Sequence, residues 1–324
     1  MKRRIFIVLA FIFIVVQCQG QRSFQVGIGG GITNYYGDLG NEPVVQWGST
    51  QPGVSLTLRN FFGVGRGLHY YPKFSAEVRF TWNRLQYDET KPIGSQTGYE
   101  LRNYGRGLSF RNDLFGLTAI GTYTFYQNKT APLHEQGPAF FLMAGVGAFY
   151  GNPKADLFRG DVGLDNKYHF WPDGTIRDSP VESGQGSIIE KDGVYETDLS
   201  DWLTEGNGTK NYPYKNLNIG FPVGLGFRKG ISESVTVSLD FGYYFFITDF
   251  LDDVSDQYPT AAEFQSKYPN DPEMQALALY ISDPTGKGNS GYPGPATSPR
   301  GNPNYKDTYS FVNLEFAYTF KLRK

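Results

Sequence analysis

The sequence predicts an all-β protein: an eight-stranded antiparallel transmembrane β-barrel with long extracellular loops and short periplasmic turns. Three observations lead to this prediction. The chain begins with an export signal, eight segments alternate between apolar and polar residues, and the connections between them are alternately long and short. Alternation matters because successive side chains of a strand point to opposite faces, and one face of a membrane barrel meets lipid.

Residues 1–20 have the pattern of a signal peptide. A basic start is followed by residues 5–16, an unbroken apolar run that is too short to cross a bilayer as a helix. Cys18 and Gly20 offer a cleavage site, which leaves residues 21–324 as one barrel domain; lipidation of Cys18 is the alternative. Cleavage after Gly20 removes the single cysteine, so no disulfide or cysteine-bound metal is expected.

The composition agrees with a membrane barrel. Mean hydropathy is −0.40, and no run after the signal peptide approaches the ~18 apolar residues of a helical membrane span. Aromatic residues make up 16% of the chain. Such a content fits a barrel in which aromatic side chains crowd the two membrane interfaces. The net charge of −2 gives no basic excess, so nucleic-acid binding is not expected, and no cofactor is predicted.

Eight segments alternate well enough to be predicted as strands. The last of them places Leu314 and Phe316 on an apolar face and Asn313 and Glu315 on the opposite face. The fifth segment is apolar on both sides, so its phase is the least defined. The predicted strands are residues 24–35, 54–62, 74–87, 112–126, 139–150, 217–228, 235–247 and 310–320.

The connections between these strands indicate how the barrel is oriented. Outer-membrane barrels have short periplasmic turns and long outer loops. With an even strand number, both termini are then expected in the periplasm, and the protein is expected in the bacterial outer membrane. The expected outer loops are residues 36–53, 88–111, about 151–216 and about 248–308, and the expected turns are residues 63–73, 127–138 and 229–234.

The last long loop is predicted to contain helices. Thr260 and Glu263 fit a capping box, and Asp271 followed by Pro272 fits an N-cap with proline at the first helical position. A one-sided apolar stripe follows Pro272, as expected for a helix that packs on one face. Residues 284–304 are rich in proline and glycine and are predicted to be a loop or disordered.

Six charged residues, three positive and three negative, are expected to point into the lumen. The interior of an eight-stranded barrel is only wide enough for side chains to fill it, so an open diffusion pore is not expected. Buried charges must be paired, which favours a balanced network that plugs the lumen. A gate, a proton relay or an error in strand phase are the alternatives. The residues are Arg59, Glu77, Arg79, Arg228, Asp240 and Glu315.

Candidates for catalysis and metal binding are few, and no catalytic residue is predicted. Of the three histidines, only His169 lies in an outer loop, near Asp161, Asp165 and Asp173. A lipid-modifying or proteolytic enzyme at this site is the rival hypothesis, beside a surface-binding barrel of unknown ligand. Four aspartates after the seventh strand are a weak calcium candidate without EF-hand spacing, or else a rim network with loop arginines. They are Asp249, Asp252, Asp253 and Asp256.

Five motifs in order resemble one family. They are residues 34–39 (NYYGDL), 108–114 (LSFRNDL), 145–155 (GVGAFYGNPKA), 221–227 (FPVGLGF) and 248–255 (TDFLDDVS). Over nearly the whole mature chain they resemble the PorG-like outer-membrane barrels of the type IX secretion system, from which the long outer loops depart. The resemblance implies a non-enzymatic component that associates with the periplasmic ring subunits, a lipoprotein and its partner. The family also contains paralogues of unknown task.

This resemblance implies that the surface facing the ring is periplasmic. We expect basic and aromatic side chains of the turns and the C-terminal tail to make the contacts. The alternative is that the basic groups only extend to the lipid headgroups of the inner leaflet. The expected partners are therefore outer-membrane lipid and the ring subunits. The candidate contacts are Arg66, His69, Tyr70, Tyr71, Lys73, Lys229, Lys321, Arg323 and Lys324.

Overall fold

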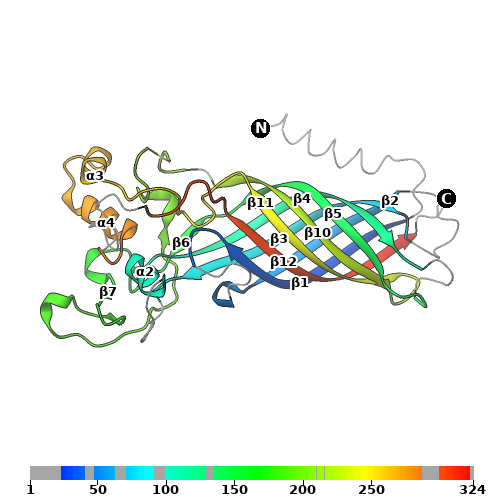
Figure 1. Ribbon diagram of the computed structural model, residues 1–324, viewed down its shortest axis with the longest axis horizontal. Coiled ribbons are helices and arrows are strands. Elements are labelled where there is room, and N and C mark those ends of the chain that lie inside the picture. Colours follow the sequence, from blue (N-terminus) through cyan, green and yellow to red (C-terminus); the bar gives the residue numbers. More distant parts are fainter. Residues whose placement is uncertain are drawn as a thin grey trace.

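Eight long strands dominate the computed structural model (Figure 1). It describes residues 23–40, 47–62, 71–90, 99–128, 134–208, 210–214, 216–286 and 299–321, so the predicted signal peptide lies outside the described residues. The strands are β1 (Ser23–Tyr36), β2 (Gln51–Phe62), β3 (Phe74–Asp88), β4 (Ser109–Tyr126), β5 (Ala139–Tyr150), β10 (Leu217–Gly230), β11 (Val235–Phe246) and β12 (Thr308–Lys321).

The strands form a closed barrel. Each pairs antiparallel with its neighbour in the chain, and β12 pairs with β1 over their full length, from Ser23 opposite Lys321 to Tyr36 opposite Thr308. The predicted eight-stranded antiparallel barrel is therefore confirmed. We call the end at which β1 begins and β12 ends the terminal end, and the opposite end the loop end. All four long connections leave from the loop end.

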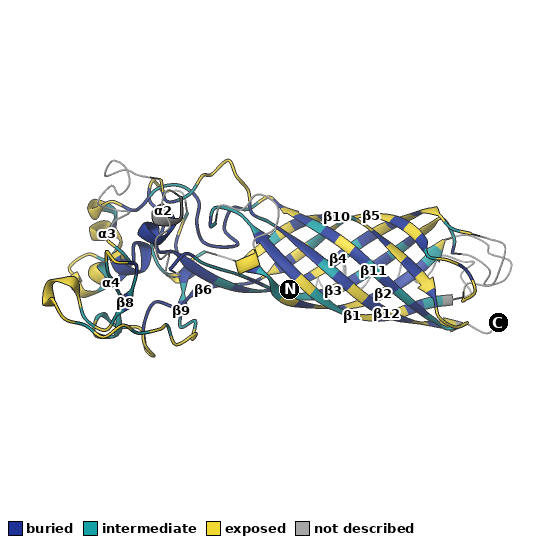
Figure 2. Ribbon diagram, turned by 60° about the horizontal axis from the view of Figure 1, so that its bottom comes forward, coloured by how far each residue is buried: buried dark blue, intermediate teal, exposed yellow. Residues whose placement is uncertain are grey.

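Alternation along each strand separates an apolar outer face from a filled interior (Figure 2). On β5, whose sequence left the phase open, Phe140 and Leu142 are exposed and Phe141 and Met143 are buried. Among the described helices, none is both long and apolar enough to cross a bilayer.

The outer face carries an apolar band bordered by aromatic rings. On β3 the band extends from Phe74 to Trp82, which at about 3.3 Å per residue and a tilt of about 40° gives roughly 20 Å of height. This is close to the ~25 Å apolar band of outer-membrane barrels. At the terminal end, rings of neighbouring strands touch, as do Phe74 with Tyr123 and Phe24 with Phe320.

The long connections fold into a cap beyond the loop end (Figure 1). Two of its helices begin as predicted, α3 with the Thr260–Glu263 capping box and α4 with Asp271 at its N-cap. The elements of the cap and rim are α2 (Tyr99–Arg106), β6 (Pro153–Ala155), β7 (His169–Phe170), β8 (Ile176–Arg177), β9 (Thr197–Asp198), α3 (Ala261–Lys267), α4 (Pro272–Ser282) and four single 3₁₀ turns, η1 (Trp47–Ser49), η2 (Leu164–Asn166), η3 (Val181–Ser183) and η4 (Leu199–Asp201).

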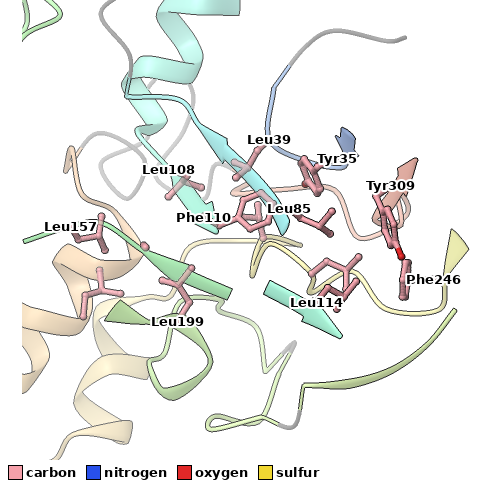
Figure 3. Packing of buried hydrophobic residues seen from close by; sticks show 14 of the residues in the cluster. Tyr35, Leu39, Leu85, Leu108, Phe110, Leu114, Leu157, Leu199, Phe246 and Tyr309 are labelled. Atoms are coloured by element: carbon pink, nitrogen blue, oxygen red, sulfur yellow. The ribbon is translucent and has the colours of Figure 1, made fainter. Parts of the chain in front are cut away.

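The cap and the barrel share one apolar core. Figure 3 shows Phe110 and Leu114 of β4 near Leu157 and Leu199 of the cap, and these residues belong to a single buried cluster. β6 pairs with β4 near the loop end, at Arg111 and Asn112, and β9 pairs with β6. Because the core is continuous, the cap is held against the barrel mouth by packing rather than tethered by loops alone.

Candidate functional site

Charged side chains fill the terminal half of the lumen. Glu77 of β3 lies at their centre, where its carboxylate accepts hydrogen bonds from Arg59 Nε at 2.7 Å and Arg79 Nη2 at 3.2 Å. Arg228 Nη2 lies 3.8 Å from the same carboxylate. Arg59 Nη2 also lies 2.8 Å from Glu315 Oε1. Four strands of the barrel thus meet in one ion-pair network.

The network extends to Asp240 through Arg79, whose Nη1 lies 2.8 Å from Asp240 Oδ1. Asn313 donates to Asp240 at 3.1 Å. The structure therefore brings together all six predicted lumen charges. Each of the six residues is at most 2% exposed. Such burial makes pairing necessary, because an isolated charge away from water is strongly unfavourable.

Strand register and a glycine make this arrangement possible. Arg59 and Glu77 lie directly opposite each other on β2 and β3, where cross-strand side chains are close neighbours. The side chain of Glu315, on β12, lies against Gly27 of β1. A Cβ atom at Gly27 would be 2.6 Å from Glu315 Cδ, so any side chain there would displace the carboxylate.

Aromatic rings surround the least satisfied cation, Arg228. No protein atom in the described residues accepts a hydrogen bond from its guanidinium, which lies 4.0 Å from the ring centre of Phe141 and 5.8 Å from that of Tyr71. Tyr71, which we expected to contact a partner, is only 4% exposed, and its hydroxyl is 2.9 Å from Thr236 Oγ1. This expectation was wrong because the residue packs into the lumen beside Arg228.

A second layer of aromatic side chains fills the loop end of the lumen. Tyr244 and Tyr309 stack with ring centres 4.5 Å apart, and Phe149 meets Phe246 edge to face at 5.0 Å. Together the charged and aromatic layers occupy the interior along the described strands, as the width of an eight-stranded barrel requires.

Two buried arginines hold the cap together, and sequence reasoning missed both. Arg106 pairs with Glu89 and donates to the backbone oxygens of Asp38 and Arg300, each at 2.8 Å. Arg300 in turn pairs with Glu205 at 2.7 Å. No local pattern marks these residues, since Asp38 and Arg300 lie in other connections than Arg106, and Glu205 precedes Arg300 by 95 residues.

The four aspartates after β11 are engaged by the protein. Asp249 accepts from Ser255 Oγ at 2.8 Å, and Asp253 accepts from Tyr214 Oη at 2.8 Å. Arg300 Nη2 lies 3.9 Å from Asp253, which is the kind of contact that the rim-network alternative expected. Asp256 shares this region through its backbone, whose oxygen accepts from Arg300 N at 2.7 Å. In the described residues, no three His, Cys, Asp or Glu side chains are arranged to hold a metal ion.

The histidine of the rival enzyme hypothesis lies on β7. Burial and, next, Lys167 lower the pKa of His169. Asp173 accepts hydrogen bonds from Thr175 and Arg177. Within the described part of the chain, no hydrogen bond or ion pair joins His169 to any of the three nearby aspartates. In a Ser–His–Asp site, a carboxylate orients the imidazole through such a contact.

The remaining candidate partner contacts lie either at the terminal end or outside the residues that the structure describes. Lys73, which directly precedes β3, and Lys229, near the end of β10, are exposed. Lys321 is the last residue of β12. The other candidates, Arg66, His69, Tyr70, Arg323 and Lys324, lie outside the described residues.

Comparison with known proteins gives likeness of fold only. No protein-family model and no curated protein matches the chain. Among solved structures, the chain is similar to the neisserial surface protein A (9% identity, 92% of this chain and 97% of that one, TM-score 0.36). It is also similar to OprG of Pseudomonas aeruginosa (10%, 94% and 99%, 0.36) and to a major outer membrane protein of Thermus thermophilus (10%, 92% and 98%, 0.33). At these TM-scores the fold rests on the strand pairing described above.

Proposed function

We propose that the chain is a non-enzymatic barrel of the bacterial outer membrane and a component of a type IX secretion machine. In this proposal its termini and short turns face the periplasm, where the terminal end associates with the ring subunits. The cap faces outward. The resemblance of the five motifs to PorG-like proteins suggests the machine, and the two ends of the barrel are the parts that we propose make contact.

The observation that supports a scaffold role is the filled lumen. All six lumen charges are buried and joined in one network, and aromatic rings occupy the interior above them. A barrel filled in this way offers its partners only its two ends and its lipid-facing wall. At the terminal end, Lys73 and Lys229 are exposed cations beyond the apolar band and can meet an acidic protein surface.

Deletion of the gene, followed by an assay for export of signal-bearing cargo, tests this proposal. We expect cargo to accumulate in the periplasm and the tagged barrel to co-purify with the ring subunits. Normal export together with no co-purification would contradict it. The His169→Ala variant is the matched control: it should restore export fully, whereas the enzyme hypothesis requires it to abolish a lipid or peptide cleavage activity.

A further inference from the structure

Two carboxyl groups share one phenol at the mouth of the barrel. Tyr35, near the end of β1, donates its hydroxyl hydrogen to Asp252 Oδ2, and its hydroxyl oxygen also lies 3.3 Å from Asp307 Oδ1. Asp252 belongs to the connection after β11, and Asp307 precedes β12. All three residues are at most 1% exposed.

The two carboxyl groups are also held by backbone amides of the same connection. Leu251 N donates to Asp307 Oδ2 at 2.8 Å, and Val254 N donates to Asp252 Oδ1 at 2.9 Å. These contacts place both carboxyl groups between the end of β1 and the loop that crosses the barrel mouth. The loop is therefore docked through its aspartates.

The charged groups around this pair are mostly negative. Asp249 and Asp38 face it, and Asp249 Oδ1 is buried without a hydrogen-bond partner. Arg300 faces Asp252 but is bound to Glu205, and Arg106, which faces Asp38, is bound to Glu89. Lys306 lies 3.9 Å from Asp249 with its side chain 46% exposed. No cation in the described residues is therefore dedicated to Asp252 and Asp307.

We propose that Asp252 and Asp307 share a proton that locks the connection between β11 and β12 onto the end of β1, and that this lock weakens and the mouth of the barrel loosens as the pH rises from acidic to neutral. The single phenol hydrogen of Tyr35 can satisfy only one of the two carboxyl groups at a time. Two ionised carboxylates that both approach the hydroxyl oxygen of Tyr35 repel each other. One added proton lets one carboxyl group donate to that oxygen while Tyr35 donates to the other.

The expected protonation states agree with this geometry. Burial, followed by the charges of Asp252 and Asp249, holds the pKa of Asp307 well above its usual range. Burial raises the pKa of Asp252 to about 7. Burial and then Asp252 raise the pKa of neighbouring Asp38 to about 8.

The direction of the pH effect follows from these raised values. In the undocked loop the aspartates meet water and have ordinary pKa values near 4. The docked state therefore binds more protons between about pH 4 and pH 7, and docking weakens as the pH rises through this window. Each retained proton changes the docking equilibrium by about tenfold per pH unit.

Hydrogen exchange of the backbone amides tests the lock in the full-length protein, refolded in lipid vesicles. Peptides that contain Leu251 and Val254 report on the docked loop. In the wild type, their protection, corrected for the intrinsic pH dependence of exchange, should fall at least tenfold per pH unit between pH 5 and pH 7. In Asp252→Asn, which keeps the shape and removes one ionisable group, the slope should be smaller by about one proton.

A matched control and a second readout keep the test decisive. Asp161→Asn changes an exposed aspartate of the cap and should leave the slope of these peptides unchanged. Infrared difference spectra should show protonated carboxyl groups that titrate near neutral pH in the wild type. This absorption should decrease by about one carboxyl group in Asp252→Asn, even if that variant folds loosely. Equal slopes in wild type and Asp252→Asn, or the absence of a protonated carboxyl band above pH 5, would overturn the proposal.

Discussion

Replacement of Glu77 by glutamine perturbs the centre of the lumen network. The variant keeps the size of the side chain and removes the charge that pairs with Arg59 at 2.7 Å and with Arg79 at 3.2 Å. Three guanidinium groups then face two carboxylates, Asp240 and Glu315, in an interior that is at most 2% exposed.

The structure sets the expected magnitude. Removal of one partner from a buried ion pair leaves an uncompensated charge and costs about 3–5 kcal/mol. Arg228 is the most weakly paired of the three cations, because its only ion-pair contact in the described residues is with Glu77 at 3.8 Å. Glu77→Gln combined with Arg228→Met restores the balance of two positive and two negative charges. The double variant should therefore recover about 1–3 kcal/mol through coupling between the two sites.

Urea unfolding of the refolded barrel in lipid vesicles measures these free energies, and the shift between folded and heat-unfolded forms on a gel provides an independent check. Asp173→Asn, which breaks the exposed ion pair with Arg177, is the control and should change stability by less than about 1 kcal/mol. If Glu77→Gln costs less than about 1 kcal/mol, or if Arg228→Met does not rescue it, the network does not hold the barrel as argued.

Three further predictions follow from the outer face, the cap and its titrating groups. Leu142→Arg, in the apolar band, should destabilise the barrel in vesicles by about 2–4 kcal/mol, whereas Ile188→Arg, equally apolar and exposed but in the cap, should not. Arg300→Met should leave Glu205 and Asp253 buried without their cation, so that limited proteolysis cuts the cap while the barrel stays intact on a gel. Burial raises the pKa of Asp156 to about 6, so its contribution to cap stability is present below about pH 4 and is lost as the pH rises through 6; hydrogen exchange at Gly193, which donates to Asp156, should follow this profile in the wild type and lose it in Asp156→Asn.

The barrel could be predicted from the sequence because its signals are local. Each strand repeats every two residues, and the observed β1, Ser23–Tyr36, exceeds the predicted residues 24–35 by one at each end. The lumen charges could be assigned for the same reason, since side-chain parity fixes which face each residue occupies. The capping box at Thr260 is a local signal as well.

The cap could not be predicted because its contacts are distant in the sequence. Arg300 lies in a stretch that its proline and glycine content marked as loop or disorder, yet it is 1% exposed and binds Glu205, 95 residues earlier in the chain. Tyr71 was misplaced because no pattern in a turn shows whether a side chain points outward or back into the lumen. The meeting of Asp252 and Asp307 at Tyr35 also depends on strand closure, which brings β1 beside β12.

Site-specific photo-cross-linking in intact cells tests whether the terminal end of the barrel meets the ring subunits. A cross-linker placed at Lys229, at the terminal end, and one placed at Ile188, in the cap, compare the two ends of the same folded barrel. We expect the Lys229 position to capture the periplasmic ring subunits and the Ile188 position not to capture them. Capture of these subunits from the cap position, or from neither position in cells that export cargo normally, would contradict this expectation.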